Sequence, residues 1–364
     1  MKKALIMLLS ALLLLSCGCA RKDATETTAP PPAEPIEYRV SFYGVGDNLI
    51  HNSVYWRAAE YAGGNGYDFT PMYEHVADDI AAADIAYINQ ETLLGGTALG
   101  LSSYPTFNSP QECGRDMIAL GFDVFSLATN HVFDMGEAGL KNTYQFFAEH
   151  PSVTQVGIYK KDENTVRIVE KNGIKISFLN YTFPTNWLSI SKNSAYHVPV
   201  ENVKNNGAEI ADAVSAAKAQ ADFVVCCVHW GEEYQNAPNA AQRAAAKAIA
   251  EAGCDVIIGT HPHTVQPVEY IGDTLVVYSL GNFISAQKAP VSQLEGAIRF
   301  DFVLKGEEKR IENVVFEPLV NHYNAGFRNL RIIPFDEYTP EKAATHGAGI
   351  SYTYLENLIE KVMQ

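Results

Sequence analysis

The chain has 364 residues, of which 47% are hydrophobic and 19% charged, a balance typical of a globular protein. With 27 Lys and Arg against 42 Asp and Glu, its formal net charge is −15. We expect no nucleic-acid partner, because nucleic-acid binding normally requires a basic face. The length allows one large domain or two of ordinary size.

The first 16 residues predict a lipoprotein signal peptide. Two lysines precede an apolar run that is too short to span a membrane, and the run ends in Leu14-Leu15-Ser16-Cys17. This ending resembles a bacterial lipobox, in which the cysteine becomes the first residue and carries the lipid. Cys17 is the favoured lipidation site, and the alternatives are lipidation at Cys19 or a plain cleaved signal peptide.

A tether is expected to follow, over residues 17–37. Four prolines lie there among Thr, Ala and Glu, without apolar periodicity, which is typical of a semi-extended linker. We therefore expect a folded part from residue 38, held by a lipid anchor at the extracytoplasmic face of the bacterial cell membrane.

Five apolar runs predict buried strands, and each of them ends in polar residues. The runs cover residues 39–46, 83–88, 123–128, 222–228 and 255–258. Helical patterns cover residues 71–82, 110–120, 135–149, 208–220 and 240–252. This alternation predicts an α/β fold whose strands are largely parallel.

Three antiparallel hairpins are predicted in the second half, over residues 165–179, 267–279 and 298–316. Because they interleave with the α/β runs, we expect one domain of two packed sheets over residues 38–322. A C-terminal extension, residues 323–364, shows no clear pattern apart from a terminal helix at residues 352–362.

The polar residues that end the predicted strands form a candidate metal site. Carboxyl ends of strands in an open α/β sheet gather along one edge, where ligand sites form. The side chains in question are Asp47, Glu91, Asn130, His131, His229, His261 and His263. Carboxylate, amide and imidazole groups without a thiolate suit Mn, Zn or Fe, and seven of them suit a pair of divalent ions. Each group alone could be an ordinary turn or surface residue, so the prediction depends on their convergence.

Six motifs follow one another along the chain. They are Gly46-Asp47-Asn-Leu-Ile-His51, Asn89-Gln-Glu91, Thr129-Asn130-His131-Val-Phe-Asp134-Met-Gly136, His229-Trp230-Gly231-Glu-Glu233-Tyr234, His261-Pro262-His263 and Tyr278-Ser-Leu-Gly281-Asn282-Phe283. Together they resemble the CapA/PgsA family of poly-γ-glutamate capsule proteins. That family is similar to the calcineurin-like metallophosphoesterases, so the resemblance implies a four-layer αββα sandwich of two mixed sheets.

The resemblance also implies roles at a dinuclear metal site. Asp47 would hold one ion, Glu91 would bridge both ions, and His263 would return to the first. The second ion would be held by Asn130, His229 and His261. His131 would be the general acid, or a charge stabiliser at the leaving group.

Some residues remain open to two interpretations. His51 lies four residues after Asp47, where the superfamily has a histidine two residues after it. A helical turn from Asn48 could bring His51 to the metal, and the alternative is that it supports a ligand or contacts substrate. Asp134 begins a near capping box, so a helix cap is favoured over the alternative that it orients His131. Substrate contacts are predicted for Asn89, Glu233, Tyr234 and Asn282, with turn or packing roles as alternatives.

Two hypotheses of function follow. The first is a metal-dependent hydrolase or transferase of a capsule or cell-envelope polymer pathway, acting on phosphoester or γ-glutamyl amide bonds. The second is a non-catalytic, membrane-tethered scaffold for polymer assembly, export or anchoring, with membrane-bound capsule synthase components as partners. An anionic polymer would be repelled by the acidic chain unless a cationic groove or the metal ions offset that charge.

Overall fold

The computed structural model describes residues 35–363. The predictions for the signal peptide, for Cys17 and Cys19, and for nearly all of the tether therefore lie outside the described residues. From Ile36 onward the chain forms a single unit of contacts.

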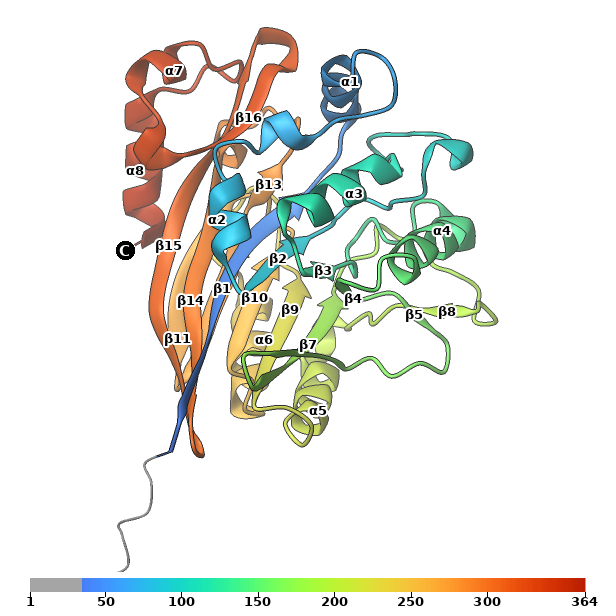
Figure 1. Cartoon of the computed structure of the whole chain (residues 1–364), viewed down its shortest axis with the longest axis vertical. Coiled ribbons are helices and arrows are strands. Elements are labelled where there is room, and N and C mark those ends of the chain that lie inside the picture. The colour runs from blue at the N-terminus through green and yellow to red at the C-terminus, as the bar shows by residue number, and fades with distance from the viewer. Residues whose placement is uncertain (1–34, 364) are drawn as a thin grey trace, which may run out of the picture. The chain divides into compact units, whose positions relative to one another are not determined.

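The first sheet is built around β1 (Glu37–Asn48), a long strand visible in Figure 1. Among the described residues its strand order is β16-β15-β14-β1-β2-β3-β4, and β13 pairs with the end of β1. The strands beside β1 on the parallel side are β2 (Ile85–Asn89), β3 (Val124–Ser126) and β4 (Thr154–Val156). Those on the antiparallel side are β14 (Leu294–Lys305), β15 (Glu308–Asn324) and β16 (Arg328–Pro334), and β13 covers Asn282–Ile284.

The second sheet has the order β11-β12-β10-β9-β7-β6. Its bounds are β6 (Arg167–Lys171), β7 (Ile174–Thr182), β9 (Phe223–His229), β10 (Val256–Thr260), β11 (Val265–Ile271) and β12 (Thr274–Leu280). The central strands are parallel and both edge strands are antiparallel to their neighbours. A separate short pair joins β5 (Tyr159–Lys160) to β8 (Tyr196–His197). The pairs β6/β7, β11/β12 and β14/β15 confirm the three predicted hairpins.

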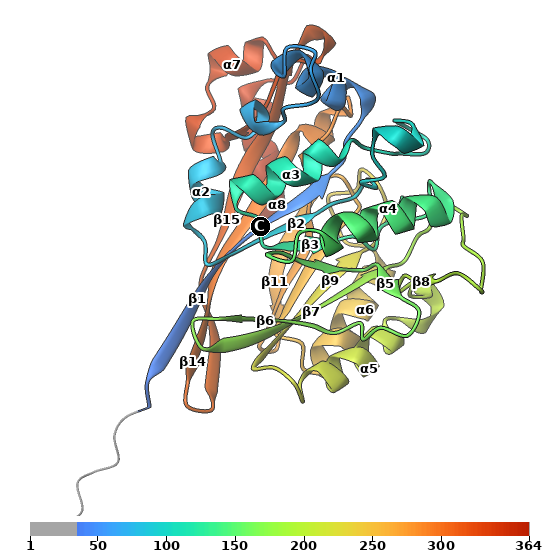
Figure 2. The ribbon, with the colours of Figure 1, turned by 45° about the vertical axis from the view of Figure 1, so that its right-hand side comes forward.

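Side chains that alternate along each strand divide the interior into layers. Val40 and Phe42 of β1 face the second sheet, whereas Tyr43 and Val45 face a layer of helices. The helices of that layer are α1 (Asn52–Tyr61), α2 (Ala77–Ala82), α3 (Gln111–Leu120) and α4 (Gly136–Ala148). The far face of the second sheet is covered by α5 (Ala208–Ala217) and α6 (Ala240–Glu251), as Figure 2 shows. This order confirms the predicted α/β fold, a four-layer αββα sandwich of two mixed sheets.

The helix expected over residues 71–82 is divided. Its start is a 3-10 turn with Pro71 in the first positions, and α2 begins only at Ala77. Helix α1, which follows β1 directly, was not expected. The short 3-10 helices are η1 (Thr70–Met72), η2 (Thr97–Leu99), η3 (Val203–Asn205), η4 (Pro290–Gln293), η5 (Ala325–Phe327) and η6 (Phe335–Glu337).

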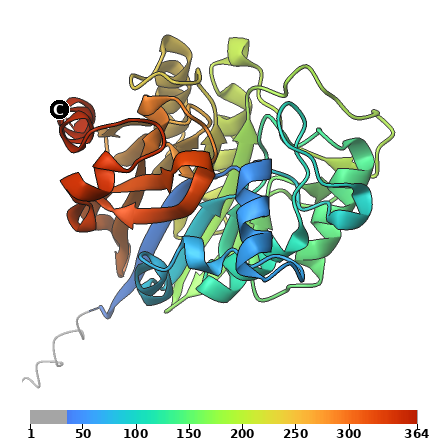
Figure 3. The same ribbon diagram turned by 90° about the horizontal axis from the view of Figure 1, so that it is seen from above.

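The segment after residue 322 is more regular than the sequence pattern indicated. The expected boundary falls within β15, and β16, α7 (Pro340–Ala344) and α8 (Tyr352–Met363) follow. Leu355 and Leu358 of α8 join an apolar cluster with Leu294 of β14. Figure 3 shows these C-terminal elements beside α1, and β16 contacts α1.

Candidate metal centre

Asp47 lies buried at the end of β1, where several groups hold its carboxylate. Asn89 Nδ2 donates to Asp47 Oδ1 at 2.7 Å, and the backbone N–H of His261 donates to Oδ2 at 3.1 Å. Asn89 Oδ1 accepts from Ser126 Oγ at 2.6 Å. Both ends of the Asn89 amide are therefore engaged inside the protein, and its Nδ2 supports the carboxylate of Asp47. The contact of Asn89 with substrate stays a prediction.

The backbone of β1 reaches this position through a close approach between two strands. A Cβ atom on Gly46 would lie 2.0 Å from the carbonyl oxygen of Gly281, so a larger residue does not fit there. The backbone N–H of Asp47 donates to that same oxygen at 3.0 Å. A glycine before Asp47 is therefore required to bring β1 and β13 together at the site.

Glu91, which follows β2, places a second carboxylate beside Asp47. Its side chain is buried, and among the described residues neither carboxylate oxygen has a hydrogen-bond partner. Burial, and then the charge of Asp47, raise the pKa of Glu91 well above its usual value. A buried carboxylate without donors is costly unless a cation accompanies it.

Two histidines lie against these carboxylates, one at the end of β9 and one in the loop after β10. His263 Nδ1 lies 3.2 Å from Asp47 Oδ2 and 3.8 Å from Glu91 Oε2. His229 is the last residue of β9. Its Nδ1 lies 3.8 Å from Asp47 Oδ1, and its Nε2 lies 3.8 Å from Glu91 Oε1. Candidate ligand atoms of Asp47, Glu91 and His263 lie within 4.8 Å of one another, as do those of Glu233, His261 and His263. The structure thus brings together predicted ligands from both sheets.

The loop that carries two of these histidines has an unusual backbone. His261 and His263 adopt φ angles of 97° and 55°, in the left-handed region that non-glycine residues seldom occupy. Such conformations persist where the surroundings impose them, and they are concentrated at functional sites.

The charge states of the rings differ. Burial, and then the neighbouring imidazole of His261, lower the pKa of His229 well below 6.5. Burial, and then His263, lower the pKa of His261 to about 3. Burial also opposes a charge on His263, but the carboxylates of Glu91 and Asp47 outweigh it and raise the pKa of His263 to about 10. Positive charge is therefore favoured next to the two acids, and the other two rings are neutral, each with a lone pair on one nitrogen.

These residues fit a divalent cation. Within the described part of the chain, the buried atoms without a hydrogen-bond partner include both Glu91 oxygens, His261 Nδ1 and His263 Nδ1. Carboxylate oxygens and neutral imidazole nitrogens are ligands of Mn, Zn and Fe.

Asn130 completes the predicted ligand set from the first sheet. Its Oδ1 lies 3.0 Å from His229 Nε2, and His229 Nδ1 lies 2.9 Å from Thr260 Oγ1. The adjacent Thr129 donates its hydroxyl to the backbone oxygen of Glu91 at 2.9 Å, which ties the two loops together.

Asp134 holds His131, and the helix cap that we favoured from the sequence is wrong. His131 Nδ1 lies 2.7 Å from Asp134 Oδ2, which also accepts from the backbone N–H of Phe107 at 2.6 Å. The N-cap of α4 is Met135, and no side chain in residues 35–363 caps that helix end. The carboxylate of Asp134 turns inward because it has a buried imidazole partner, and His131 Nε2 lies 4.0 Å from Glu91 Oε1.

His51 reaches the rim of the site by a different route from the one expected. β1 remains extended to Asn48, so there is no helical turn at that residue, and His51 is the N-cap of α1. Its Nδ1 lies 3.2 Å from both Leu49 O and the backbone nitrogen of Ala286. Burial lowers the pKa of His51 to about 4. Phe107 packs edge-on against both His51 and His131.

The sequence of this chain also matches a known protein family. A profile of the family described as bacterial capsule synthesis protein PGA_cap matches residues 41–287, more than half of the chain. The chain belongs to this family.

Relatives of this PGA_cap protein include two capsule proteins of bacilli. It is 36% identical over 172 residues to the PGA biosynthesis protein CapA of Bacillus subtilis (strain 168). This alignment covers 46% of this chain and 44% of the relative. It is 34% identical over 182 residues to the capsule biosynthesis protein CapA of Bacillus anthracis. That alignment covers 50% of this chain and 44% of the relative. The chain therefore spans less than half the length of these curated relatives.

Among solved structures, a novel phosphatase of Mycoplasma pneumoniae matches with a TM-score of 0.46 and 11% identity, over 78% of this chain and 95% of that chain. A 5'-nucleotidase precursor from Thermus thermophilus matches with a TM-score of 0.46 and 13% identity, over 89% of this chain and 58% of that chain. Because both TM-scores are below 0.5, the description of the fold rests on the layers seen in this chain and not on these two matches.

Two of the remaining predicted contacts, Tyr234 and Asn282, differ in their exposure. Tyr234 is partly exposed, its backbone N–H donates to Pro262 O at 2.7 Å, and its hydroxyl accepts from Gln287. Asn282 pairs with Asp47 in register, and its buried Oδ1 lacks a hydrogen-bond partner among the described residues.

Glu295 of β14 is a buried acid near the site that the sequence analysis missed. It accepts from the backbone N–H of Asn282 at 2.5 Å, and burial raises its pKa well above the usual value. Glu295 lies inside an apolar strand and belongs to no motif, so the sequence did not indicate an acid near the site.

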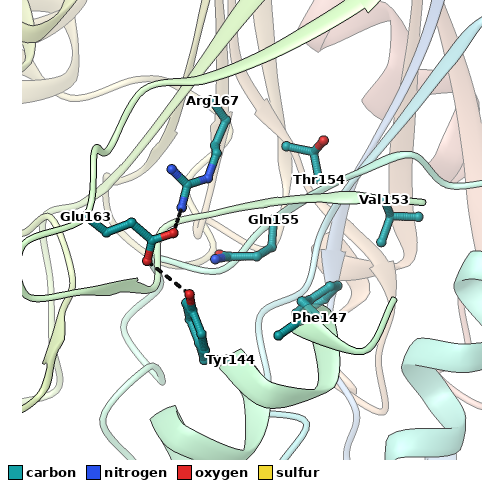
Figure 4. Close-up of a pocket in the computed structure, with 8 residues that line it drawn as sticks. Tyr144, Phe147, Val153, Thr154, Gln155, Glu163 and Arg167 are labelled. Carbon is teal, nitrogen blue, oxygen red and sulfur yellow. Dashed lines mark hydrogen bonds and ion pairs between the residues drawn. The ribbon is translucent and has the colours of Figure 1, made fainter. Parts of the chain in front are cut away.

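A separate pocket of about 210 Å³ lies against β4 and α4 (Figure 4). Its lining includes none of the predicted site residues. Glu163 lies between Arg167 and Tyr144, and it forms an ion pair with the first and a hydrogen bond with the second. These groups satisfy one another, so we assign the pocket no chemistry.

Proposed function

We propose that this PGA_cap-family protein is a metal-dependent hydrolase or transferase of a capsule or cell-envelope pathway, acting on phosphoester or γ-glutamyl amide bonds. The observation that carries the proposal is the convergence of buried Asp47 and Glu91 with His229 and His263, drawn from both sheets, with ligand atoms left without partners. The two relatives named for capsule or PGA biosynthesis support the pathway.

Two divalent cations are proposed at this site. Their ligands would be Asp47, Glu91, Asn130, His229, His261 and His263. When bound, such ions would polarise the scissile group and lower the pKa of water.

The chain's own residues would bind the substrate and move the proton. The Nδ1–H of His131 donates a hydrogen bond to Asp134, so Nε2 faces the site, and in its doubly protonated form the ring would pass the Nε2 proton to the leaving group. Tyr234 and Asn282 would orient the substrate. Burial of the ligands would limit the access of bulk water to the reacting groups.

The proposal is tested with the purified full-length protein in detergent, stripped of metal and reloaded with Mn²⁺, Zn²⁺ or Fe²⁺. Turnover of bis-p-nitrophenyl phosphate or of a γ-glutamyl peptide is expected, and His263→Ala should abolish it. If neither substrate turns over, and His263→Ala leaves polymer output in cells unchanged, the proposal fails and the scaffold function is favoured.

We also propose that the protein is lipid-anchored through Cys17 at the outer face of the cell membrane. Residues 35–363 contain no helix that is both long and apolar enough to cross a bilayer. Cys17→Ala should move the protein from the membrane fraction to the soluble fraction. Contact with membrane-bound synthase components would be tested by crosslinking in the same cells.

A further inference from the structure

The loop that follows β7 crosses from the second sheet to the metal centre. It leaves the sheet at Thr182 and returns at Val200, which forms a bridge with Thr182. On the way, the backbone N–H of Ala195 donates to Glu137 Oε1 of α4 at 3.1 Å. Asn186, near the start of the loop, contacts both Asn130 and His131. The loop therefore connects the two halves of the site.

The backbone of this loop is unusual at the same place. Asn186 and Trp187 have φ angles of 48° and 63°. Asparagine tolerates this left-handed region, but a bulky residue such as tryptophan rarely adopts it. The Trp187 side chain is fully exposed, at 102%, so its own packing does not explain the conformation. Unusual backbone angles next to a functional site indicate that the residue held there has a role in that site. Here that residue is Asn186.

The amide of Asn130 has two different ends, and its function depends on which end faces the site. Asn130 Oδ1 lies 3.0 Å from His229 Nε2, on the ligand side. Asn130 Nδ2 donates to Asn186 Oδ1 at 3.4 Å, on the opposite side. If the amide rotated by half a turn, its NH₂ group would face the cation and could not ligate it.

Asn186 does not act in the same way on the neighbouring histidine. Its Nδ2 lies 3.3 Å from His131 Nδ1, but that nitrogen already donates a hydrogen bond to Asp134 Oδ2 at 2.7 Å. Both nitrogens therefore carry protons, and neither accepts a hydrogen bond from the other. The hydrogen bond that supports the inference is the one from Asn130 Nδ2 to Asn186 Oδ1.

We propose that Asn186 is a positioning residue, whose Oδ1 orients the amide of Asn130 so that Asn130 Oδ1 faces the cation site. This inference rests on the proposed function, because it assumes a cation beside Asn130. Side chains that orient metal ligands typically contribute about 10–100-fold to metal affinity. The long hydrogen bond here places the expected effect at the lower end of that range.

The test measures binding of Mn²⁺ to the metal-free full-length protein by calorimetry, without substrate. Asn186→Ala should weaken binding about tenfold. Asn186→Asp keeps an acceptor for Asn130 Nδ2 and should bind as tightly as the wild type or more so. Asn193→Ala removes an exposed side chain of the same type from the same loop and should bind like the wild type. Thermal unfolding of the metal-free Asn186→Ala protein should be unchanged.

The possible failures are distinguishable. If the wild type binds no divalent cation, the proposed function and this inference both fail. If the wild type binds Mn²⁺ and Asn186→Ala binds it equally well, only the inference is wrong. If Asn186→Ala lowers the stability of the metal-free protein and Asn186→Asp does not restore affinity, the residue is structural and the inference is overturned.

Discussion

Asp134 Oδ2 accepts hydrogen bonds from the ring of His131 and from the backbone of Phe107, and its side chain is buried. This carboxylate fixes the tautomer of His131, since Nδ1 must carry the proton that is donated. It would also stabilise a positive charge on the ring, as a carboxylate does for a catalytic histidine in general. In the proposed mechanism, the nitrogen of His131 that acts on the substrate would therefore be Nε2.

We expect Asp134→Asn to lower kcat on bis-p-nitrophenyl phosphate by about 100-fold, since an uncharged amide cannot stabilise the imidazolium form. Mn²⁺ affinity should stay within about twofold, because His131 is not among the predicted ligands. Glu149→Gln, at the exposed C-terminal end of α4, is a control and should change kcat little. Loss of Mn²⁺ binding in Asp134→Asn would contradict this assignment.

At the scale of elements, packing between the two sheets sets the distance between the ligands. Phe42 of β1 and Phe300 of β14 stack with ring centroids 4.6 Å apart, inside the cluster that joins the sheets. Asp47 belongs to one sheet and His263 to a loop of the other. The geometry of the site therefore depends on this apolar layer.

Phe300→Ala should destabilise the protein by about 3–5 kcal/mol, because it leaves a cavity in a buried aromatic layer. Urea unfolding would measure this change. Val315→Ala, at a half-exposed position of β15, should stay within about 0.5 kcal/mol of the wild type. Equal effects of the two substitutions would show that the layer between the sheets is not a tightly packed core.

The C-terminal elements are attached to β15 through a neutral histidine. His346 Nε2 donates to Asn321 O at 3.1 Å, and Nδ1 accepts from the backbone N–H of Ala348 at 3.0 Å. Burial lowers the pKa of His346 from 6.5 to about 4, against a smaller opposing effect of the hydrogen bond to Asn321. Burial also lowers the pKa of His322, which packs against this ring, to about 4.

A pH dependence of stability follows. Both imidazoles are neutral in the folded state, so below pH 6.5 the unfolded chain binds protons that the folded chain does not. Their contribution to stability is complete above pH 6.5 and falls as the pH is lowered toward 4. His346→Gln should reduce the loss of unfolding free energy between pH 7 and about pH 4.5. An identical loss in wild type and variant would contradict this account.

At the scale of the whole molecule, the predicted ligands come from positions 47 to 263 of the chain and meet only after both sheets have formed. A cation that binds this set binds the folded state and not the unfolded one. Binding and folding are therefore thermodynamically linked.

Mn²⁺ at about 100 times its Kd should raise the free energy of unfolding by about 2.7 kcal/mol. Calorimetric melts with Mn²⁺ and with a chelator would measure this shift. His263→Ala should remove most of the difference between the two melts. A melting temperature that is indifferent to both additions would contradict metal binding.

Much of this architecture could be predicted from sequence because it follows from periodicity. Alternating and continuous apolar runs indicated the strands, and the polar residues at their ends indicated Asp47, Glu91 and the histidines. Asn186 and Glu295 could not be found in this way, because their contacts join segments that are distant in sequence. Asp134 was misassigned because local spacing does not show whether a carboxylate points outward to a helix end or inward to a ring.

The length and pairing of β1 have a mechanical consequence. At about 3.3 Å per residue, β1 carries the chain about 33 Å from Glu37 to Asp47. It is paired with β14 in continuous register from Glu37–Lys305 to Val45–Ala297. If the chain is held ahead of Glu37, tension along the strand would load this ladder in shear. The hydrogen bonds between Glu37 and Val45 would then share the load instead of opening one by one, and the ladder would bear the pull before it reached Asp47.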